Sequence, residues 1–362
     1  MERQLIKAIY QPQSVNNFST EDWNKLLVQA RASNLLGRLC YIFQQQKIDL
    51  PERMKNHLES AWAISNKQKM QTLFEIREIL RATDKIEENI VVLKGAAYCA
   101  LKLPCSEGRT FSDIDIMVAK NVIRSVEVSL LLNGWVKTVQ DDYDQQYYRQ
   151  WMHEIPPLRH SQRDTVIDVH HNILPLTNQS APDSKQFKLR EIHLDDIGLC
   201  LVLDELDMLI HCCVHLFAES EFNNSLRDLS DIYMMLQGIL EKDPEALSKL
   251  LVRADELGLG TYVKLAIRNN HKVFSLPLSA DVKQRLSTDK MFSQRIVNWC
   301  FQQLFVPNHS SCRTMFTPIA EFLLYIRGHR LRMPLRLLLP HLYKKASRNI
   351  KTLFEKDTVE PI

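Results

Sequence analysis

Several features are scarce in this sequence, and each scarcity excludes a class of protein. The eight cysteines are irregularly scattered and form no CxxC pair, which excludes a disulfide framework and predicts a reducing cytoplasm as the location. No apolar run reaches the roughly 18 residues that a membrane-spanning helix needs. Residues 1–14 contain no apolar signal core, so we expect no secretion signal. Internal repeats and low-complexity segments are also missing.

What remains is the composition of an ordinary globular protein, with 45% hydrophobic and 25% charged residues. The 362 residues are enough for two or three domains with a real core. The formal net charge of +3 is too close to balance to identify a partner, so local clusters of charge are more informative than the total.

The chain divides into three regions by the period of its apolar residues. Residues 1–88 have helical periods, with a capping box at Ser19 and Asp22 and a long helix predicted over 52–88. Residues 89–193 alternate strands and helices, which predicts a compact α/β or α+β core. Residues 194–362 return to helical periods and end in a basic tail. Strands are predicted at 89–95, 113–118, 135–139, 145–151 and 165–171, and a helix at 120–133 that ends at Gly134.

Two acidic residues stand two apart in the predicted strand DIDIMV. Asp113 and Asp115 point to the same face of a strand, where like charges repel each other. An exposed edge strand explains this alternation, and so does a divalent metal site, because hard cations such as Mg²⁺ take oxygen ligands and relieve the repulsion. A neighbouring strand, VIDVHH, would bring Asp168 beside them. Three carboxylates around two Mg²⁺ ions, with Mn²⁺ as an alternative, suit phosphoryl or nucleotidyl transfer.

Gly95 stands between the predicted strand NIVVLKG and a segment with a helical period. Because the chain has only nine glycines, we interpret this one as a turn that lets backbone N–H groups approach a phosphate. A simple strand-to-helix turn needs glycine equally often, and that alternative stays open.

These elements together resemble a known family. LKGAA, then R-x-x-SDIDIMV, then VIDVHH are similar to the uncharacterised bacterial nucleotidyltransferase family of the DNA polymerase beta superfamily. That superfamily carries a glycine-containing turn, an Asp-x-Asp/Glu strand and a later Asp on a neighbouring strand. The resemblance covers most of the chain, including LRDLSDIYMML in the helical tail. It implies a small mixed-sheet nucleotidyltransferase core flanked by N-terminal and C-terminal helical regions.

The resemblance also implies roles for individual residues. Asp113 and Asp115 would bind both metals, and Asp168 would bind the catalytic metal and help to deprotonate the acceptor. Gly95 and Ala96 would line the phosphate turn. The superfamily often has serine where this chain has Ala96, which motivates a second hypothesis: a non-catalytic nucleotide-binding or scaffold protein that retains the fold.

Polar residues near these motifs each have a functional and a structural interpretation. Lys94 and Arg109 are candidates to pair with triphosphate oxygens, Arg109 through its fork of donors, although a single cation is more often a surface residue. Ser112 either orients the loop before the aspartates or is an ordinary turn residue. His170 shares a face with Asp168, where it would touch a phosphate, orient a carboxylate or be structural.

Two clusters in the helical tail have alternatives of the same kind. His211 and His215 have the i, i+4 spacing of zinc ligands, but a buried helix face explains them better. Arg227, Asp228 and Asp231 would form either a polar wall facing the nucleotide or an internal salt-bridge cluster.

The end of the chain is strongly basic. Residues 322–354 contain eight Lys and Arg residues and no acidic residue, with leucines between them. This pattern predicts peripheral contact with a membrane surface or a polyanion, or else a basic solvated face.

The leading hypothesis is a Mg²⁺-dependent nucleotidyltransferase. It would move a nucleoside monophosphate from a nucleoside triphosphate to a hydroxyl acceptor and release pyrophosphate. The acceptor stays open between a small molecule, a sugar, a protein and an RNA end, because kinship of fold does not choose between them. A nucleic-acid-processing member of the superfamily is a further hypothesis.

Overall fold

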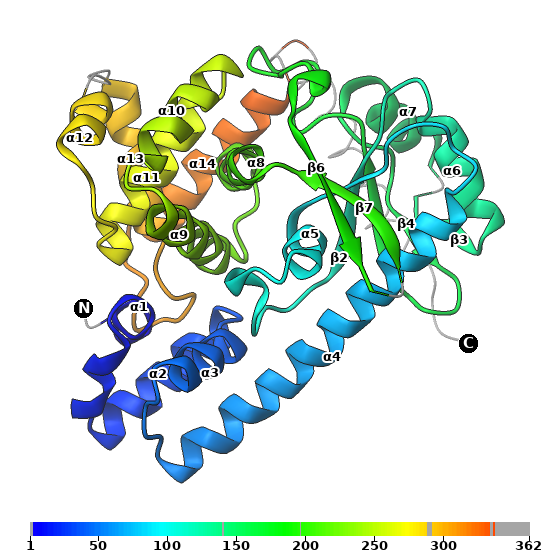
Figure 1. Cartoon of the computed structure of the whole chain (residues 1–362). Helices are drawn as coiled ribbons and strands as arrows, with labels where there is room; N and C mark the ends of the chain where they lie inside the picture. Colours follow the sequence, from blue (N-terminus) through cyan, green and yellow to red (C-terminus); the bar gives the residue numbers. More distant parts are fainter. Residues whose placement is uncertain (1–2, 140, 196, 288–291, 334–335, 337–362) are drawn as a thin grey trace, which may run out of the picture.

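The computed structural model describes residues 3–139, 141–195, 197–287, 292–333 and 336. Within them, the strands form one seven-stranded mixed sheet in the order β3-β4-β5-β2-β1-β7-β6. Figure 1 shows this sheet on the right, the N-terminal helices at the lower left and the C-terminal helices at the upper left. The arrangement confirms the predicted α+β fold. The strands are β1 (Val91–Val92), β2 (Asp113–Met117), β3 (Trp135–Lys137), β4 (Leu158–His160), β5 (Val166–His170), β6 (Leu189–Leu194) and β7 (Gly198–Leu203).

Helices precede the sheet, connect its strands and follow it. Before the sheet come α1 (Gln4–Tyr10), α2 (Thr20–Ala32), α3 (Leu36–Gln45) and α4 (Glu52–Ala82). Between strands come α5 (Lys94–Ala100), α6 (Ile123–Leu132) and α7 (Asp142–Trp151). After the sheet come α8 (Glu205–Ala218), α9 (Ser225–Lys242), α10 (Ala246–Glu256), α11 (Gly260–Phe274), α12 (Ala280–Ser287), α13 (Phe292–Leu304) and α14 (Thr317–Arg332). Short 3-10 helices are η1 (Pro12–Asn17), η2 (Pro104–Ser106) and η3 (Ser184–Gln186).

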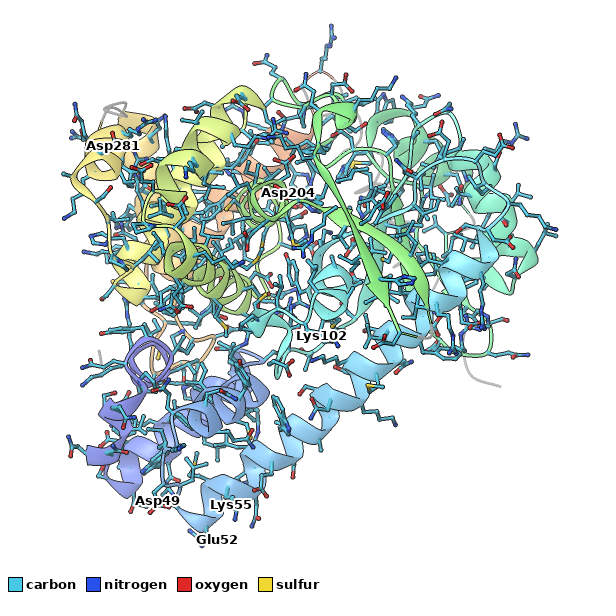
Figure 2. The ribbon with its side chains drawn as sticks, in the orientation of Figure 1. Asp49, Glu52, Lys55, Lys102, Asp204 and Asp281 are labelled. Atoms are coloured by element: carbon cyan, nitrogen blue, oxygen red, sulfur yellow. The ribbon has the colours of Figure 1, made fainter. Side chains whose placement is uncertain are left out.

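The long helix α4 connects the N-terminal helices to the sheet. It begins at a charged, exposed turn marked by Asp49, Glu52 and Lys55 at the bottom of Figure 2, and its other end reaches β2 and α6. The predicted capping box lies before it, at the start of α2. There, the Ser19 hydroxyl accepts from the Asp22 N–H at 3.2 Å, and the Asp22 carboxylate accepts from the Ser19 N–H at 3.0 Å. No described helix has both the length and the apolarity to cross a bilayer.

Three predicted elements have different bounds in the structure. Residues 145–151 were expected as a strand but belong to α7, because Arg149 contacts Gln145 one turn back and pairs with Glu127 of α6. Helix α4 ends at Ala82 rather than near residue 88. Helices return at α8 rather than near residue 194, because β7 is an apolar strand that pairs in parallel with β1 and completes the sheet.

The two faces of the central strands differ sharply. Strands β2 and β5 pair in parallel, with Asp115 directly opposite Asp168. Alternate residues of both strands point to the other face, where they form part of the hydrophobic core and are at most 2% exposed: Ile114, Ile116, Ile167 and Val169. The predicted alternation of polar and apolar residues is therefore confirmed, and it leaves the acidic face free for a site.

Two of the nine glycines allow the backbone of α3 to lie in close contact with the loop that leads into β2. A Cβ atom on Gly37 would lie 2.5 Å from the carbonyl oxygen of Gly108, and a Cβ atom on Gly108 would overlap the Gly37 carbonyl. Gly108 also has a φ of +66°, which side chains strongly disfavour. Helix α4 holds the same loop, because the side chain of Gln68 accepts from the Phe111 N–H at 3.1 Å. The start of β2 is thus held by the N-terminal helices.

We expect Gly108→Ala to lower the free energy of unfolding by about 2–4 kcal/mol, since the methyl group overlaps Gly37 and the backbone is left-handed. Gly238→Ala is the matched control, because a Cβ atom at this position of α9 meets nothing within 4 Å. It should raise the free energy of unfolding by about 0.5–1 kcal/mol. Urea denaturation followed by circular dichroism measures both, and equal effects would contradict the tight contact between the two glycines.

Candidate functional site

The acidic residues of β2 and β5 meet at one cleft. Asp115 and Asp168 are opposite each other in the parallel pair, and Asp113 lies on the same face two residues before Asp115. All three line a cleft of about 400 Å³ between the sheet and helices α8 and α9. The structure therefore brings the three predicted aspartates together, although they are far apart in the sequence.

Asp168 has an unsatisfied carboxylate oxygen. Its Oδ1 is buried and has no hydrogen-bond partner within the described structure. Burial, together with the nearby charge of Asp115, raises the pKa of Asp168 to about 7. A hard divalent cation would supply the missing partner and relieve the repulsion between the carboxylates. Carboxylate oxygens are the ligands that Mg²⁺ and Mn²⁺ prefer, although these three aspartates are not among the described groups whose ligand atoms all lie within 4.8 Å of one another.

Asp115 is compensated by two basic side chains. Lys94 Nζ donates to its Oδ1 at 2.8 Å, and His170 Nε2 lies 2.9 Å from the same oxygen. Burial alone would raise the pKa of Asp115, but the charge of Lys94 and the contact with His170 outweigh burial and lower it. His170 Nδ1 in turn lies 3.2 Å from a carboxylate oxygen of Glu154. His170 therefore orients a carboxylate, which is one of its three predicted roles.

The turn before α5 is shaped by Lys94 and Gly95. Lys94 has a φ of +46°, a left-handed conformation that strains a residue with a side chain. Gly95 lines the cleft, and a Cβ atom there would lie 2.7 Å from a guanidinium nitrogen of Arg109 and 3.0 Å from the Phe111 ring. A side chain at position 95 would therefore crowd the guanidinium of Arg109 and the ring of Phe111. Ala96 is 2% exposed and is not part of the cleft wall that the described residues form.

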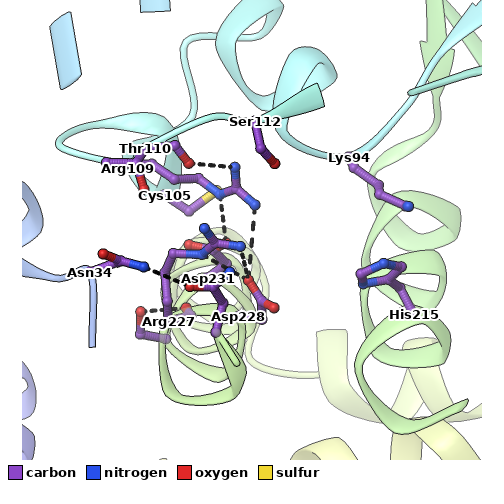
Figure 3. A network of polar contacts seen from close by, with 12 residues as sticks. Asn34, Lys94, Cys105, Arg109, Thr110, Ser112, His215, Arg227, Asp228 and Asp231 are labelled. Carbon is purple, nitrogen blue, oxygen red and sulfur yellow. Dashed lines mark hydrogen bonds and ion pairs between the residues drawn. The ribbon is translucent and has the colours of Figure 1, made fainter. Parts of the chain in front are cut away.

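Arg109 lines the cleft but is already paired, as Figure 3 shows. Its Nε donates to Asp231 Oδ2 at 2.9 Å, and its guanidinium lies 3.9 Å from Asp228. The other oxygen of Asp231 accepts from Arg38, a fully buried residue of α3, at 2.7 Å. Burial would raise the pKa of Asp231, but Arg38 and Arg109 outweigh burial and lower it. Arg227, Asp228 and Asp231 of α9 thus belong to an internal salt-bridge cluster, and they also line the cleft.

The sequence motifs did not reveal Arg38 or Glu154. The sequence did hold a signal for Arg38, because the chain contains the pair Gly-Arg both at 37–38 and at 108–109. In the structure the two glycines touch, and both arginines donate to Asp231. Glu154 gave no local signal. Ser112 is exposed, and its hydroxyl donates to Asp113 Oδ1 at 2.9 Å, so it supports the first aspartate.

A second hollow of about 480 Å³ adjoins the cleft, and both share Lys94, Glu154 and His215 in their walls. Figure 3 shows Lys94 and His215 on the opposite side of the view from Arg109. In the second hollow, three ligand atoms lie within 4.8 Å of one another, one each from His153, Glu154 and His170. His211 and His215 are not in that group. Burial lowers the pKa of His211 to about 3, as expected for a core histidine.

In the metal-free protein, we expect Asp168→Asn to raise the free energy of unfolding by about 1–3 kcal/mol at pH 8. The pKa of Asp168 is about 7 when folded, against a reference of 3.8, so ionisation destabilises the fold as the pH rises between these values. An amide escapes this penalty, and its advantage should vanish below about pH 4. Thermal unfolding from pH 4 to 8 measures the difference.

Millimolar Mg²⁺ should raise the melting temperature of the native protein at pH 8 and raise that of the Asp168→Asn variant less, because the variant has lost one ligand charge. A pH-independent gain from Asp168→Asn, or equal shifts with Mg²⁺, would contradict this description of the site.

Comparison with known proteins agrees with this geometry. The model of a family described as uncharacterised nucleotidyltransferase matches residues 19–275, which include β1 to β7 and the cluster on α9. No curated protein and no solved structure matches the chain. Because the family match covers well over half of the chain and all three aspartates, the chain belongs to this family of uncharacterised nucleotidyltransferases, which are transferases of phosphorus-containing groups.

Proposed function

We propose that the protein transfers a nucleoside monophosphate from a nucleoside triphosphate to a hydroxyl group of a small molecule and releases pyrophosphate. The observation that carries this proposal is the pair Asp115 and Asp168, side by side in a cleft, with one buried oxygen that has no partner among the described residues. The family match supports nucleotidyl transfer in general.

The residues of the cleft have distinct proposed tasks. Asp113, Asp115 and Asp168 would hold Mg²⁺ or Mn²⁺, which supplies charge neutralisation for the triphosphate and activation of the attacking hydroxyl when bound. Lys94 supports phosphate binding, because it lines the cleft and its hydrogen bond to Asp115 uses one of the three donors of its ammonium group. Arg109 is bound to Asp231 by a charged hydrogen bond, so we assign it to holding the loop before β2 rather than to the nucleotide.

In the proposed reaction, the acceptor oxygen attacks the α-phosphorus. The bond from this phosphorus to the bridging oxygen breaks, and the electron pair leaves with pyrophosphate. Asp168 takes the hydroxyl proton, since its buried Oδ1 has no hydrogen-bond partner in the described structure and its side chain lines the cleft.

The second hollow supports a small-molecule acceptor. Its volume of about 480 Å³ lies in the range of small-ligand pockets. Apolar side chains such as Ile173 and Leu174 line it together with His153 and Glu154. We therefore propose an acceptor that carries its hydroxyl group beside an apolar part.

The eight cysteines are free and buried, which supports the proposed location in a reducing cytoplasm.

Asp115→Asn and Asp168→Asn should each reduce pyrophosphate release by about 10²–10⁴-fold, because each removes a ligand charge and Asp168 is also the proposed base. The assay uses purified protein, α-labelled triphosphates, Mg²⁺ and a small-molecule cell extract. Asp164→Asn is the matched control: the same chemical change at a carboxylate whose side chain is 78% exposed and lies outside the cleft walls.

Three results would count against the proposal. Label transfer that survives both changes would remove these aspartates from the mechanism. Triphosphate binding in calorimetry with no pyrophosphate release in any extract would favour the non-catalytic hypothesis. Label that appears only on protein or RNA, when whole-cell extract replaces the small-molecule extract, would contradict the small-molecule acceptor.

A further inference from the structure

Helix α14 buries its narrow face and exposes its large apolar side chains. Ala320, Leu324 and Gly328 face the protein, and Gly328 is so close to α8 that a Cβ atom would lie 2.6 Å from the carbonyl oxygen of Glu219. The larger side chains on the other face are 40–62% exposed: Ile319, Phe322, Leu323 and Ile326. In an ordinary globular helix, such side chains would face the core instead.

These exposed side chains form one continuous stripe. Their spacing of i, i+3, i+4 and i+7 places them on the same side of the helix. Residues just before α14 extend the stripe, with Met315 80% and Phe316 49% exposed. The ring of Trp299, on α13, lies 6.1 Å from that of Phe316 and is itself 38% exposed. We call these seven residues of α13, α14 and the preceding turn the apolar face.

A surplus of positive charge adjoins the apolar face. Arg330 and Arg336 are exposed, and residues 330–351 contain seven Lys and Arg residues and no acidic residue. Residues 334–335 and those from 337 onward lie outside the described structure. The acidic residue on α14, Glu321, is neutralised by Arg313 at 2.6 Å. Arg332, which lies between the two exposed arginines in the sequence, is paired with Glu219. The described surface therefore combines an apolar stripe with two exposed cations that follow it in the chain, Arg330 and Arg336.

We propose that the apolar face docks on an anionic membrane surface, with the exposed Arg330 and Arg336 next to lipid phosphates. A bilayer interface accepts aromatic and aliphatic side chains of an interfacial helix, and anionic headgroups attract adjacent Lys and Arg residues. A second copy of this chain would bring the same positive charge to the contact, which disfavours self-association at low salt. The charge therefore favours lipid as the occupant. This docking is peripheral and does not depend on the proposed reaction.

Flotation with lipid vesicles tests the proposal. At low salt, the full chain should float with vesicles that contain phosphatidylglycerol and stay behind with phosphatidylcholine alone. The combined variant Ile319→Ser, Phe322→Ser and Ile326→Ser should reduce the bound fraction by about tenfold or more. Raised salt should weaken binding of the native chain.

Three other exposed side chains provide the matched control: Ile64, Leu132 and Leu176 are 58%, 82% and 49% exposed on other parts of the protein. Changing all three to serine should leave vesicle binding intact. Thermal unfolding and pyrophosphate release establish that both combined variants are folded.

Several outcomes would overturn the docking proposal. The native chain would fail to float with anionic vesicles at low salt, or it would bind neutral vesicles as well as anionic ones. Equal binding of anionic vesicles by the native chain and by the α14 variant would also overturn it. Self-association that the α14 variant abolishes, without any lipid binding, would assign the face to a second copy instead.

Discussion

Two like charges held side by side by a strand register are the constraint on which this site depends. The parallel pairing of β2 and β5 puts Asp115 opposite Asp168, and this register keeps the two Cβ atoms on one face of the sheet. Asp115 is stabilised as an anion by Lys94 and His170. Asp168 has no such compensation at Oδ1, and its pKa rises toward neutrality. Without a bound cation, the site therefore holds one firmly ionised carboxylate beside one whose pKa is raised, and a cation bound between them would relieve the repulsion that raises it.

A second charged cluster holds the frame around that pair. Asp231 accepts from Arg38 with one oxygen and from Arg109 with the other, so it joins α3, the loop before β2 and α9 at one buried point. Buried ion pairs add little net stability, but the loss of one partner leaves a buried charge that is costly. The cluster therefore acts mainly by fixing where the loop lies. The contact between Gly37 and Gly108 serves the same purpose through the backbone, which explains why two of so few glycines are used there.

The sequence predicted the features that local patterns encode and missed those that depend on distant partners. Alternating polarity identified β2 and correctly placed Asp113 and Asp115 on one face of a strand, and an apolar run of β-type residues identified β5. The α+β class and the helical regions on both sides followed from the same periods. The partner of Arg109 could not be predicted, because Asp231 lies 122 positions further along the chain and on a different element. Residues 145–151 were misread for a similar reason, since the helix there is supported by a pair with Glu127 that no local period reveals.

Manganese anomalous scattering from a crystal soaked with Mn²⁺ and a non-hydrolysable nucleoside triphosphate tests the central claim most directly. We expect anomalous density among the carboxylates of Asp113, Asp115 and Asp168, with the triphosphate beside Lys94. Density at the group His153, Glu154 and His170 alone, or a triphosphate bound away from the aspartates, would contradict it.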